Sequence, residues 1–290
     1  MGELLQGKEI AGYIKEEVAK EIASLGPAGR SLKLCAVLIG DDCEASLYSQ
    51  LQERVAAKLG IGYMLHKIPG NISEPAAIQE LERLNQDPAI TGIIVQIPIP
   101  KHLDPRNLIN HIHPWKDVEG LHPENMGRIV LDREHIVPCT PCAVMELLRS
   151  ADITLYGKEA VVVGHSDIVG KPLALMLLNK GATVTICHIA TAERGLLAEH
   201  IGRAEVLVVA VGKRNVIKGS WVRKGAVVID VGITCTDGTV QGDVEFEPAR
   251  ERAAFITPVP GGVGPLTVAL LMRNVVKASR LQHAGKHASA

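Results

Sequence analysis

Residues 159–172 constrain the fold more than any other part of the chain. Residues 160–163 are an unbroken apolar run, which is typical of a strand covered on both faces of a sheet. Gly164 ends this run, Gly170 follows, and residues 171–178 have the composition of a helix. The amino terminus of a helix can bind an anion with its free backbone amides. The stretch therefore predicts a strand, a tight turn and a helix that could hold the pyrophosphate of a cofactor.

The glycine spacing alone leaves a turn without a ligand as an alternative, because Gly-x-Ser-x-x-x-Gly departs from the usual Gly-x-Gly-x-x-Gly. Further apolar strands are predicted at residues 182–187, 205–210 and 226–230, and the segments between them are long enough for helices. This alternation is typical of a doubly wound parallel sheet, which binds ligands beyond the carboxyl ends of its strands. The second half of the chain is therefore predicted to be a Rossmann-like domain.

The first part of the chain also has an α/β pattern. Apolar periodicity predicts helices at residues 10–25, 47–59 and 73–85 and strands at residues 34–39, 63–68 and 92–97. Residues 113–127 are predicted to be a long polar loop, residues 268–277 a helix, and the tail after Leu281 is expected to fray. We expect two α/β domains: residues 1–143, completed by a C-terminal helix at 266–282, and residues 144–265.

Composition narrows the classes of partner. The 290 residues carry a net charge of −1, without a basic stripe, so nucleic acid is not an expected partner. No apolar run approaches the roughly 20 residues that span a bilayer, and no leader pattern is present at the N-terminus, so no membrane association is expected. Cys139 and Cys142 have no second pair that would complete a zinc site, so no metal is expected. We expect a cytoplasmic protein.

A glutamine in a strand is the most informative polar residue of the first part. Gln96 lies in the apolar run 93–97, and a buried amide must be hydrogen-bonded, either to the backbone or to a ligand. Tyr48 and Gln52 are four residues apart and therefore share one face of the predicted helix.

Several motifs, taken in order, resemble the bifunctional methylenetetrahydrofolate dehydrogenase/cyclohydrolase family over nearly the whole chain. They are Gly40-Asp41 to Tyr48, Val95–Pro100, Lys116–Gly120, Pro138–Pro141, Val163–Pro172, Asp230–Ile233 and Thr257–Pro265. The resemblance implies a folate substrate, NAD or NADP as cofactor, and a homodimer.

The resemblance also implies site residues. The catalytic positions would be Tyr48, Gln52 and Gln96, and the substrate-binding positions Glu119, Pro260, Gly261 and Gly262. The cofactor-binding positions would be Gly164, His165, Ser166, Ile168, Gly170, Ile189 and Ile233.

Some of these positions depart from the family pattern. Gln52 stands where the family has a catalytic lysine, Ala45 where it has a serine, and Glu119 where it has an aspartate. Hydride transfer depends mainly on positioning, whereas hydrolysis needs a group that can take a proton from water, which a neutral amide cannot do. We therefore expect dehydrogenase activity, with weak or absent cyclohydrolase activity. His165 and Ile189 replace residues that would pair with a 2′-phosphate, which favours NAD.

The sequence leaves three alternative functions open. The protein could be a regulatory paralogue that binds folate and dinucleotide without turnover, since three departures affect the folate side. It could act on a modified pterin, because Glu119 reaches about 1.5 Å further than aspartate. It could also keep both activities if a lysine from another segment, such as Lys101 or Lys116, reaches the site.

Overall fold

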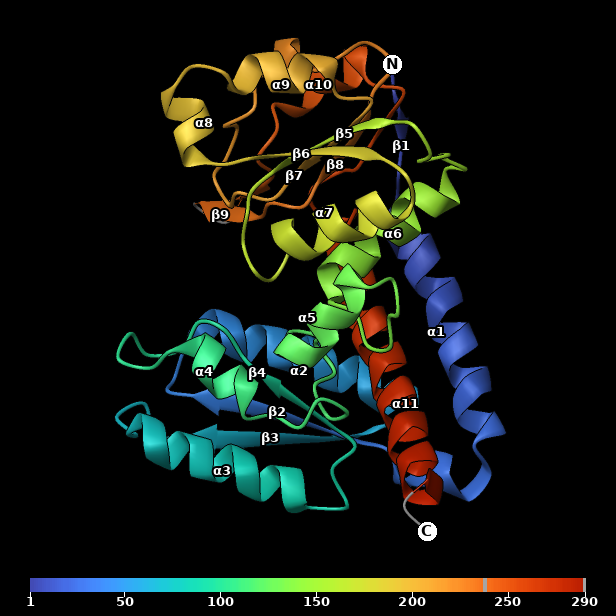
Figure 1. The fold of residues 1–290 in the computed structure, drawn as a ribbon, viewed down its shortest axis with the longest axis vertical. Coiled ribbons are helices and arrows are strands. Elements are labelled where there is room, and N and C mark those ends of the chain that lie inside the picture. The colour runs from blue at the N-terminus through green and yellow to red at the C-terminus, as the bar shows by residue number, and fades with distance from the viewer. Residues whose placement is uncertain (237–238, 289–290) are drawn as a thin grey trace. The chain divides into compact units, whose positions relative to one another are not determined.

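The computed structural model describes residues 1–236 and 239–288, which form two compact units (Figure 1). The first unit combines Met1–Gly12 with Cys139–Thr267, and the second combines Tyr13–Pro138 with the chain from Val268 onward. The predicted fold class, two α/β domains of which the second is Rossmann-like, is confirmed. Within the described residues, we find no helix with the length and apolar composition needed to cross a membrane.

The first unit is built on a six-stranded parallel sheet. Its strand order is β1 (Glu3–Leu4), β11 (Phe255–Ile256), β8 (Val227–Asp230), β7 (Val206–Val209), β5 (Glu159–Val163) and β6 (Thr183–Cys187). Its helices are α6 (Cys139–Ser150), α7 (Gly170–Asn179), α8 (Ile189–Glu193), α9 (Leu197–Arg203) and α10 (Phe246–Arg252), with a short 3-10 turn at Gly219–Trp221. In Figure 1, α9 and α10 cover one face of the sheet and α7 covers the other. Strands β5, β7 and β8 are covered on both faces, which explains their continuous apolar runs.

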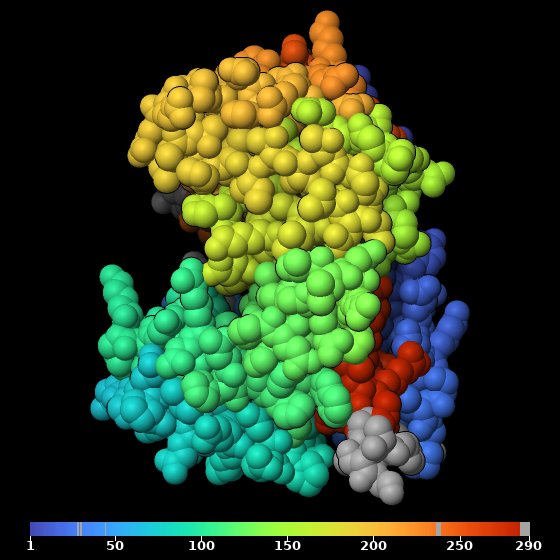
Figure 2. Space-filling view, in the orientation of Figure 1, coloured from blue at the N-terminus to red at the C-terminus, as the bar shows by residue number. Residues whose placement is uncertain are grey.

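The second unit contains a three-stranded parallel sheet with the order β3 (Gly62–Ile68), β2 (Lys33–Ile39) and β4 (Gly92–Val95). Its helices are α2 (Cys43–Lys58), α3 (Glu74–Gln86), α4 (Pro105–Asn110), α5 (Pro123–Val130), and most of α1 (Gly7–Ser24) and α11 (Gly264–Ala288), with a 3-10 turn at Gly26–Ser31. Alternate residues of β2 and β4 pack into one core with α3 and α4. The surfaces of these two helices adjoin in Figure 2, cyan for α3 and blue-green for α4.

The amino terminus belongs to the six-stranded sheet. We expected residues 1–143 to form one domain, but β1 pairs in parallel with β11, and the amides of Glu3 and Leu5 donate to the carbonyls of Ala254 and Ile256. Two residues are too short a strand to show an apolar period, so the sequence did not indicate this pairing.

Several element boundaries differ from the prediction. The polar loop expected at 113–127 ends early, because α5 begins at Pro123 and the His122 ring accepts a hydrogen bond from the amide of Glu124. Helix α2 begins four residues before its predicted start, since the Asp42 carboxylate caps the amide of Ala45.

The end of the chain also differs from the prediction. Helix α11 continues to Ala288, where fraying was expected. The Gln282 side chain anchors its last part, because it donates to the carbonyls of Thr91 and Trp115.

Candidate functional site

Helix α2 presents a narrow buried stripe to the three-stranded sheet. Ala45, Ser49, Gln52 and Ala56 recur at helical spacing and are almost fully buried. Three of these four residues, Ala45, Ser49 and Ala56, are small, which brings the helix close to the sheet. Gln52 therefore lies inside the unit, where its polar atoms need partners.

The Gln52 side chain is the centre of a four-residue hydrogen-bond network. Its Oε1 atom accepts from Gln96 Nε2 at 2.8 Å and from the Tyr63 hydroxyl at 3.0 Å. The Tyr63 hydroxyl also bonds the Ser49 hydroxyl at 2.7 Å. Gln52 Nε2 is buried and has no hydrogen-bond partner among the described residues. We call Ser49, Gln52, Tyr63 and Gln96 the amide network.

The structure brings Gln52 and Gln96 into contact, while Tyr48 lies one turn before Gln52 on α2. Tyr48 is partly exposed, at 39%, whereas Gln52 is inaccessible to solvent. Gln96 follows the end of β4. Its backbone N–H donates to the carbonyl of Val37, which extends the hydrogen bonding between β4 and β2 by one residue.

The cationic side chains that could replace a catalytic lysine are engaged or exposed. Lys116 Nζ donates to the carbonyls of Leu84 and Asp87, so it caps the end of α3. Arg54 and Lys58 lie on the exposed face of α2, and Lys101 is exposed in a turn.

Glu119 lies in a turn beside β4. The turn is held by Asp117, whose carboxylate accepts from the amides of Gly120 and His122 and from Asn125 Nδ2. Asn274 on α11 donates to the carbonyl of Val118. Burial, together with the nearby Asp117 carboxylate, raises the pKa of Glu119 to about 8. This carboxyl group is therefore largely protonated near neutral pH.

The turn after β5 in the first unit has the tight backbone that its glycines predicted. Gly164 has a φ of 122°, and a Cβ atom there would lie 2.3 Å from the carbonyl oxygen of Ala210. A Cβ atom at Gly170 would lie 2.1 Å from the oxygen of Gly164. Each glycine is required for the close approach of strand, turn and helix.

The start of α7 is partly satisfied from within the turn. Ser166 Oγ accepts from the amide of Val169 at 3.1 Å, and the Ser166 carbonyl accepts from the amide of Lys171 at 3.0 Å. Pro172 has no amide hydrogen to offer. The start of α7 therefore has fewer free backbone N–H groups than the sequence suggests.

The carboxyl edge of the sheet carries one exposed apolar side chain after each of four strands. They are Ile168 after β5, Ile189 after β6, Val211 after β7 and Ile233 after β8, with exposures of 41%, 69%, 46% and 57%. Large apolar side chains in such positions are suited to contact flat rings of a bound ligand. The tight glycine turn and these side chains together fit a dinucleotide.

Two imidazoles and one ion pair lie at the same edge. The rings of His165 and His188 are 5.1 Å apart between centroids, and His188 also caps α8. Lys171 Nζ is 2.5 Å from the carboxylate of Asp167. The nearest lysine of the turn is therefore already paired with an acid.

A buried aspartate organises the loop after β7. The Asp243 carboxylate accepts from the amides of Val211, Gly212 and Lys213 at 2.6 to 2.9 Å. The neighbouring Asp230 accepts from the amides of Asp243 and Val244. Burial raises the pKa of Asp230 to about 7. These contacts fix the loop that carries the exposed Val211.

The Pro260–Gly262 loop is held against the start of α1. The amide of Gly7 donates to the carbonyl of Gly261 at 2.9 Å, and Gly261 has a φ of 112°. A Cβ atom at Gly7 would overlap the carbonyl oxygen of Gly262. The loop therefore has a defined backbone that leaves little space around it.

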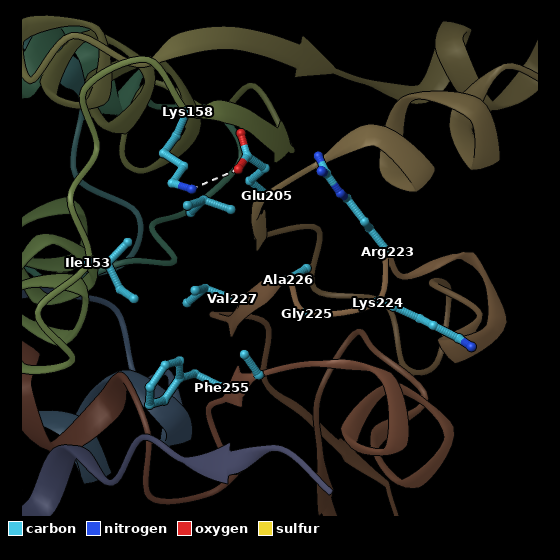
Figure 3. A pocket seen from close by; sticks show the side chains of 11 residues that line it. Ile153, Lys158, Glu205, Arg223, Lys224, Gly225, Ala226, Val227 and Phe255 are labelled. Atoms are coloured by element: carbon cyan, nitrogen blue, oxygen red, sulfur yellow. Dashed lines mark hydrogen bonds and ion pairs between the residues drawn. The ribbon is translucent and has the colours of Figure 1, made fainter.

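A separate cavity of about 240 Å³ opens at the amino ends of the same strands (Figure 3). Phe255, Val227 and Ile153 line it, and a 2.7 Å ion pair between Lys158 and Glu205 lies at its rim. It lies at the opposite edge of the sheet from the glycine turn, so it is not the predicted dinucleotide site.

Sequence reasoning missed four residues of this arrangement: Tyr63, Ser49, Val211 and Asp243. The sequence indicates only a strand at Tyr63, and it does not distinguish Ser49 from the other residues of its helix. Val211 could have been found, because it follows an apolar strand as Ile233 does. Asp243 gave no local signal, since its three donors lie about 30 residues earlier.

Comparison with protein families gives two matches that together span most of the chain. Residues 5–119 match the catalytic domain of tetrahydrofolate dehydrogenase/cyclohydrolase. Residues 138–283 match the NAD(P)-binding domain of the same family.

Individual relatives agree with these matches over nearly their whole length. The chain is 43% identical to the bifunctional protein FolD of Geotalea uraniireducens, over 97% of this chain and 99% of that protein. The crystal structure of the FolD enzyme of Campylobacter jejuni has a TM-score of 0.93 at 38% identity, covering 97% of this chain and 100% of that one. The Trypanosoma brucei enzyme, solved with NADP and an inhibitor, has a TM-score of 0.91 at 36% identity, covering 97% and 98%.

Proposed function

The chain belongs to the tetrahydrofolate dehydrogenase/cyclohydrolase family, and from this membership we propose that it is an NAD(P)-dependent 5,10-methylenetetrahydrofolate dehydrogenase. The observation that carries the proposal is the glycine turn after β5, with four exposed apolar side chains at the carboxyl edge of the sheet. The dinucleotide would supply the hydride acceptor, held by Gly164, Ser166, Gly170 and these apolar side chains.

Hydride transfer from methylenetetrahydrofolate requires little proton transfer by the protein. The two folate nitrogens beside the methylene group stabilise the cation that forms when a hydride leaves. The protein then has to position the substrate and exclude water. The candidate residues for this are Tyr48, the amide network and Glu119 in the second unit and the Pro260–Gly262 loop in the first unit.

We propose that cyclohydrolase activity is weak or absent. Hydrolysis of the methenyl product requires a group that takes a proton from water, and loss of such a base costs about 10²–10⁴ in rate. The amide network has no group that ionises near neutral pH, because it consists of two amides, a serine and a tyrosine whose pKa is raised to about 12 by burial. Because relatives such as the FolD protein of Geotalea uraniireducens are named bifunctional, the proposed loss of cyclohydrolase activity is the clearest difference from them that can be tested.

The central experiment supplies purified protein with methylenetetrahydrofolate and either NAD or NADP. We expect absorbance of the reduced cofactor and of the methenyl product to rise together, with the methenyl product accumulating. Failure to form NADH or NADPH with folded protein at high concentration would contradict the proposed dehydrogenase.

A second assay supplies methenyltetrahydrofolate directly. We expect it to disappear at the rate measured in buffer without protein. Rapid hydrolysis would show that the chain keeps both activities through a base outside the amide network.

For the cofactor we propose a preference for NAD over NADP. Ile189 has no charge for a 2′-phosphate, and Lys171 is paired with Asp167. The His165 ring lies beside the ring of His188, with 5.1 Å between centroids and an angle of 52° between the ring planes. A kcat/KM much larger with NADP would overturn this preference.

A binding protein without turnover is the second candidate function. The observation in its favour is the closed amide network, in which Gln52 is inaccessible. Binding of a folate and of NAD without hydride transfer between them would establish it. From the family resemblance we also propose a homodimer, which light scattering after size-exclusion chromatography would test.

A further inference from the structure

Three consecutive backbone N–H groups in the loop after β7 converge on one carboxylate. Asp243 Oδ2 accepts from the N–H groups of Val211 and Gly212, at 2.6 and 2.9 Å. Its Oδ1 atom accepts from the N–H group of Lys213 at 2.8 Å. Gly212 has a φ of 68°, which helps to turn successive N–H groups to the same side of the chain. Such a backbone concavity binds anions, and here the carboxylate of Asp243 occupies it.

Asp243 is itself held in place through its own backbone. Its N–H group donates to the carboxylate of Asp230 at the end of β8, at 3.1 Å. Its carbonyl accepts from the N–H group of Ile217 at 3.0 Å. The residue is inaccessible to solvent, so water does not compete for the carboxylate. The loop after β7 is therefore fastened to a buried, fixed anchor.

The turn after β8 passes close to the same carboxylate. A Cβ atom at Gly232 would overlap the Asp243 side chain, so the backbone of this turn packs directly on it. Strands β7 and β8 are neighbours in the sheet, and each is followed by an exposed apolar side chain, Val211 and Ile233. Asp243 therefore touches the backbone of both segments that carry these side chains.

We propose that Asp243 is a positioning residue for the dinucleotide: its carboxylate holds the loop after β7 in the conformation in which Val211 contacts a flat ring of the bound cofactor. Because Asp243 takes up the N–H groups of residues 211–213, this loop offers the cofactor an apolar surface and not a phosphate site. The inference rests on the proposed NAD(P) site and adds to it a buried residue far from it in sequence.

The first test is Asp243→Asn, which keeps the shape of the side chain. Both carboxylate oxygens accept backbone N–H groups, so in either orientation the NH₂ end of an asparagine would face at least one of these donors. We expect the Kd for NAD, measured by calorimetry, to rise about tenfold or more, with kcat at saturating NAD changed less than about threefold. The KM for methylenetetrahydrofolate should not change. Glu245→Gln is the matched control, because Glu245 accepts the N–H group of Gly219 in a different turn.

A second variant changes the loop and leaves Asp243 intact. Gly212→Ala places a Cβ atom in open space, but at a φ of 68° that disfavours alanine. Gly225→Ala is its control, since Gly225 has a φ of 79° and open space, and it precedes β8 at the opposite edge of the sheet. The two changes should lower the free energy of unfolding to a similar extent, whereas only Gly212→Ala should raise the Kd for NAD, by about three- to tenfold. Equal NAD affinities of the two variants would overturn the proposal.

A double-mutant cycle separates positioning from a general loss of stability. In a Val211→Ala background the loop lacks most of the contacting side chain, so Asp243→Asn should weaken NAD binding less than it does in the unsubstituted protein. Equal effects in both backgrounds would overturn the proposal. Urea unfolding gives the stability of each variant independently of binding. The same cycle with Gly212→Ala in place of Asp243→Asn makes the result independent of whether the Asp243 variant folds.

The outcomes separate this inference from the proposed function. Coupling between positions 243 and 211 in NAD binding, without hydride transfer by the unsubstituted protein, would refute the dehydrogenase and keep the positioning role. NADH formation by the Asp243→Asn protein with an unchanged KM for NAD would do the reverse. If the unsubstituted protein bound neither NAD nor NADP, both would be overturned.

Discussion

The glycine turn after β5 in the first unit and the buried face of α2 in the second are both candidate functional regions, yet they are built differently. The turn depends on the absence of side chains, since Gly164 and Gly170 leave no space for a Cβ atom. The face of α2 depends on side chains that satisfy one another, with Gln52 at the centre. A steric requirement tolerates almost no substitution, whereas a hydrogen-bond network can change its members together. The difference explains how Gly164 and Gly170 can be fixed by the backbone while the buried face of α2 can exchange its polar residues.

The largest expected effect comes from filling the turn. Gly164→Ala should lower the free energy of unfolding by about 2–4 kcal/mol and abolish measurable NAD binding, because the new Cβ would overlap the Ala210 carbonyl in a backbone that disfavours it. Urea unfolding and calorimetry measure the two effects. Gly127→Ala is the control, since it adds a methyl group to an open position of α5 and should be neutral or slightly stabilising. Equal effects of the two changes would refute the steric argument.

A lysine on the buried face of α2 should change the chemistry there. Gln52→Lys would place an amine beside Tyr63 and Gln96, where burial lowers the pKa of the amine and makes it available as a base. We expect hydrolysis of methenyltetrahydrofolate to rise at least about tenfold. Gln50→Lys adds the same charge on the exposed face of the helix and should have no effect. No gain with a folded Gln52→Lys protein would mean that the rest of the pocket cannot support hydrolysis.

Glu119 predicts a pH dependence of stability. Its folded pKa of about 8 lies above the ordinary value of 4.5, so the folded state binds the proton more tightly than the unfolded state. The protonated Glu119 side chain makes its full contribution to the free energy of unfolding below pH 4.5, and this contribution is lost as the pH rises through about 8. The free energy of unfolding of Glu119→Gln should therefore rise by about 1–3 kcal/mol relative to that of the unsubstituted protein as the pH increases from 5 to about 9.

Denaturant unfolding at several pH values measures this gain. Glu134→Gln removes an exposed carboxyl group and should show no pH-dependent difference. A constant difference between Glu119→Gln and the unsubstituted protein at all pH values would rule out the raised pKa.

The smallest expected effect concerns the lysine of the turn. Lys171→Ala should change the ratio of kcat/KM for NADP to that for NAD by less than about threefold, because Lys171 is half-exposed and paired with Asp167. A selective loss of activity with NADP would show that Lys171 leaves this pair to bind a phosphate.

Much of the fold could be predicted because its signals are local. The valine run of β5 and the glycines after it indicate strand and turn within about a dozen residues. Boundaries set by single side chains were harder, as at Asp42 and His122, whose caps moved the starts of α2 and α5. The candidate site was predictable at the level of residue type: Gln96 needed a partner, and Gln52 could not act as a lysine.

The sequence by itself determined the alternation of strands and helices, the glycine turn and the amide at position 52, because each depends on neighbouring residues or on residue type alone. Only the tertiary structure decided what Gln52 contacts. Tyr63 is 11 residues away on β3 and Gln96 is 44 residues away beyond β4. Their meeting depends on how closely α2 packs on the sheet, which small residues such as Ala45 and Ala56 permit. A hydrogen bond between distant residues requires their backbones to be placed within a few tenths of an ångström, and no local pattern specifies that placement.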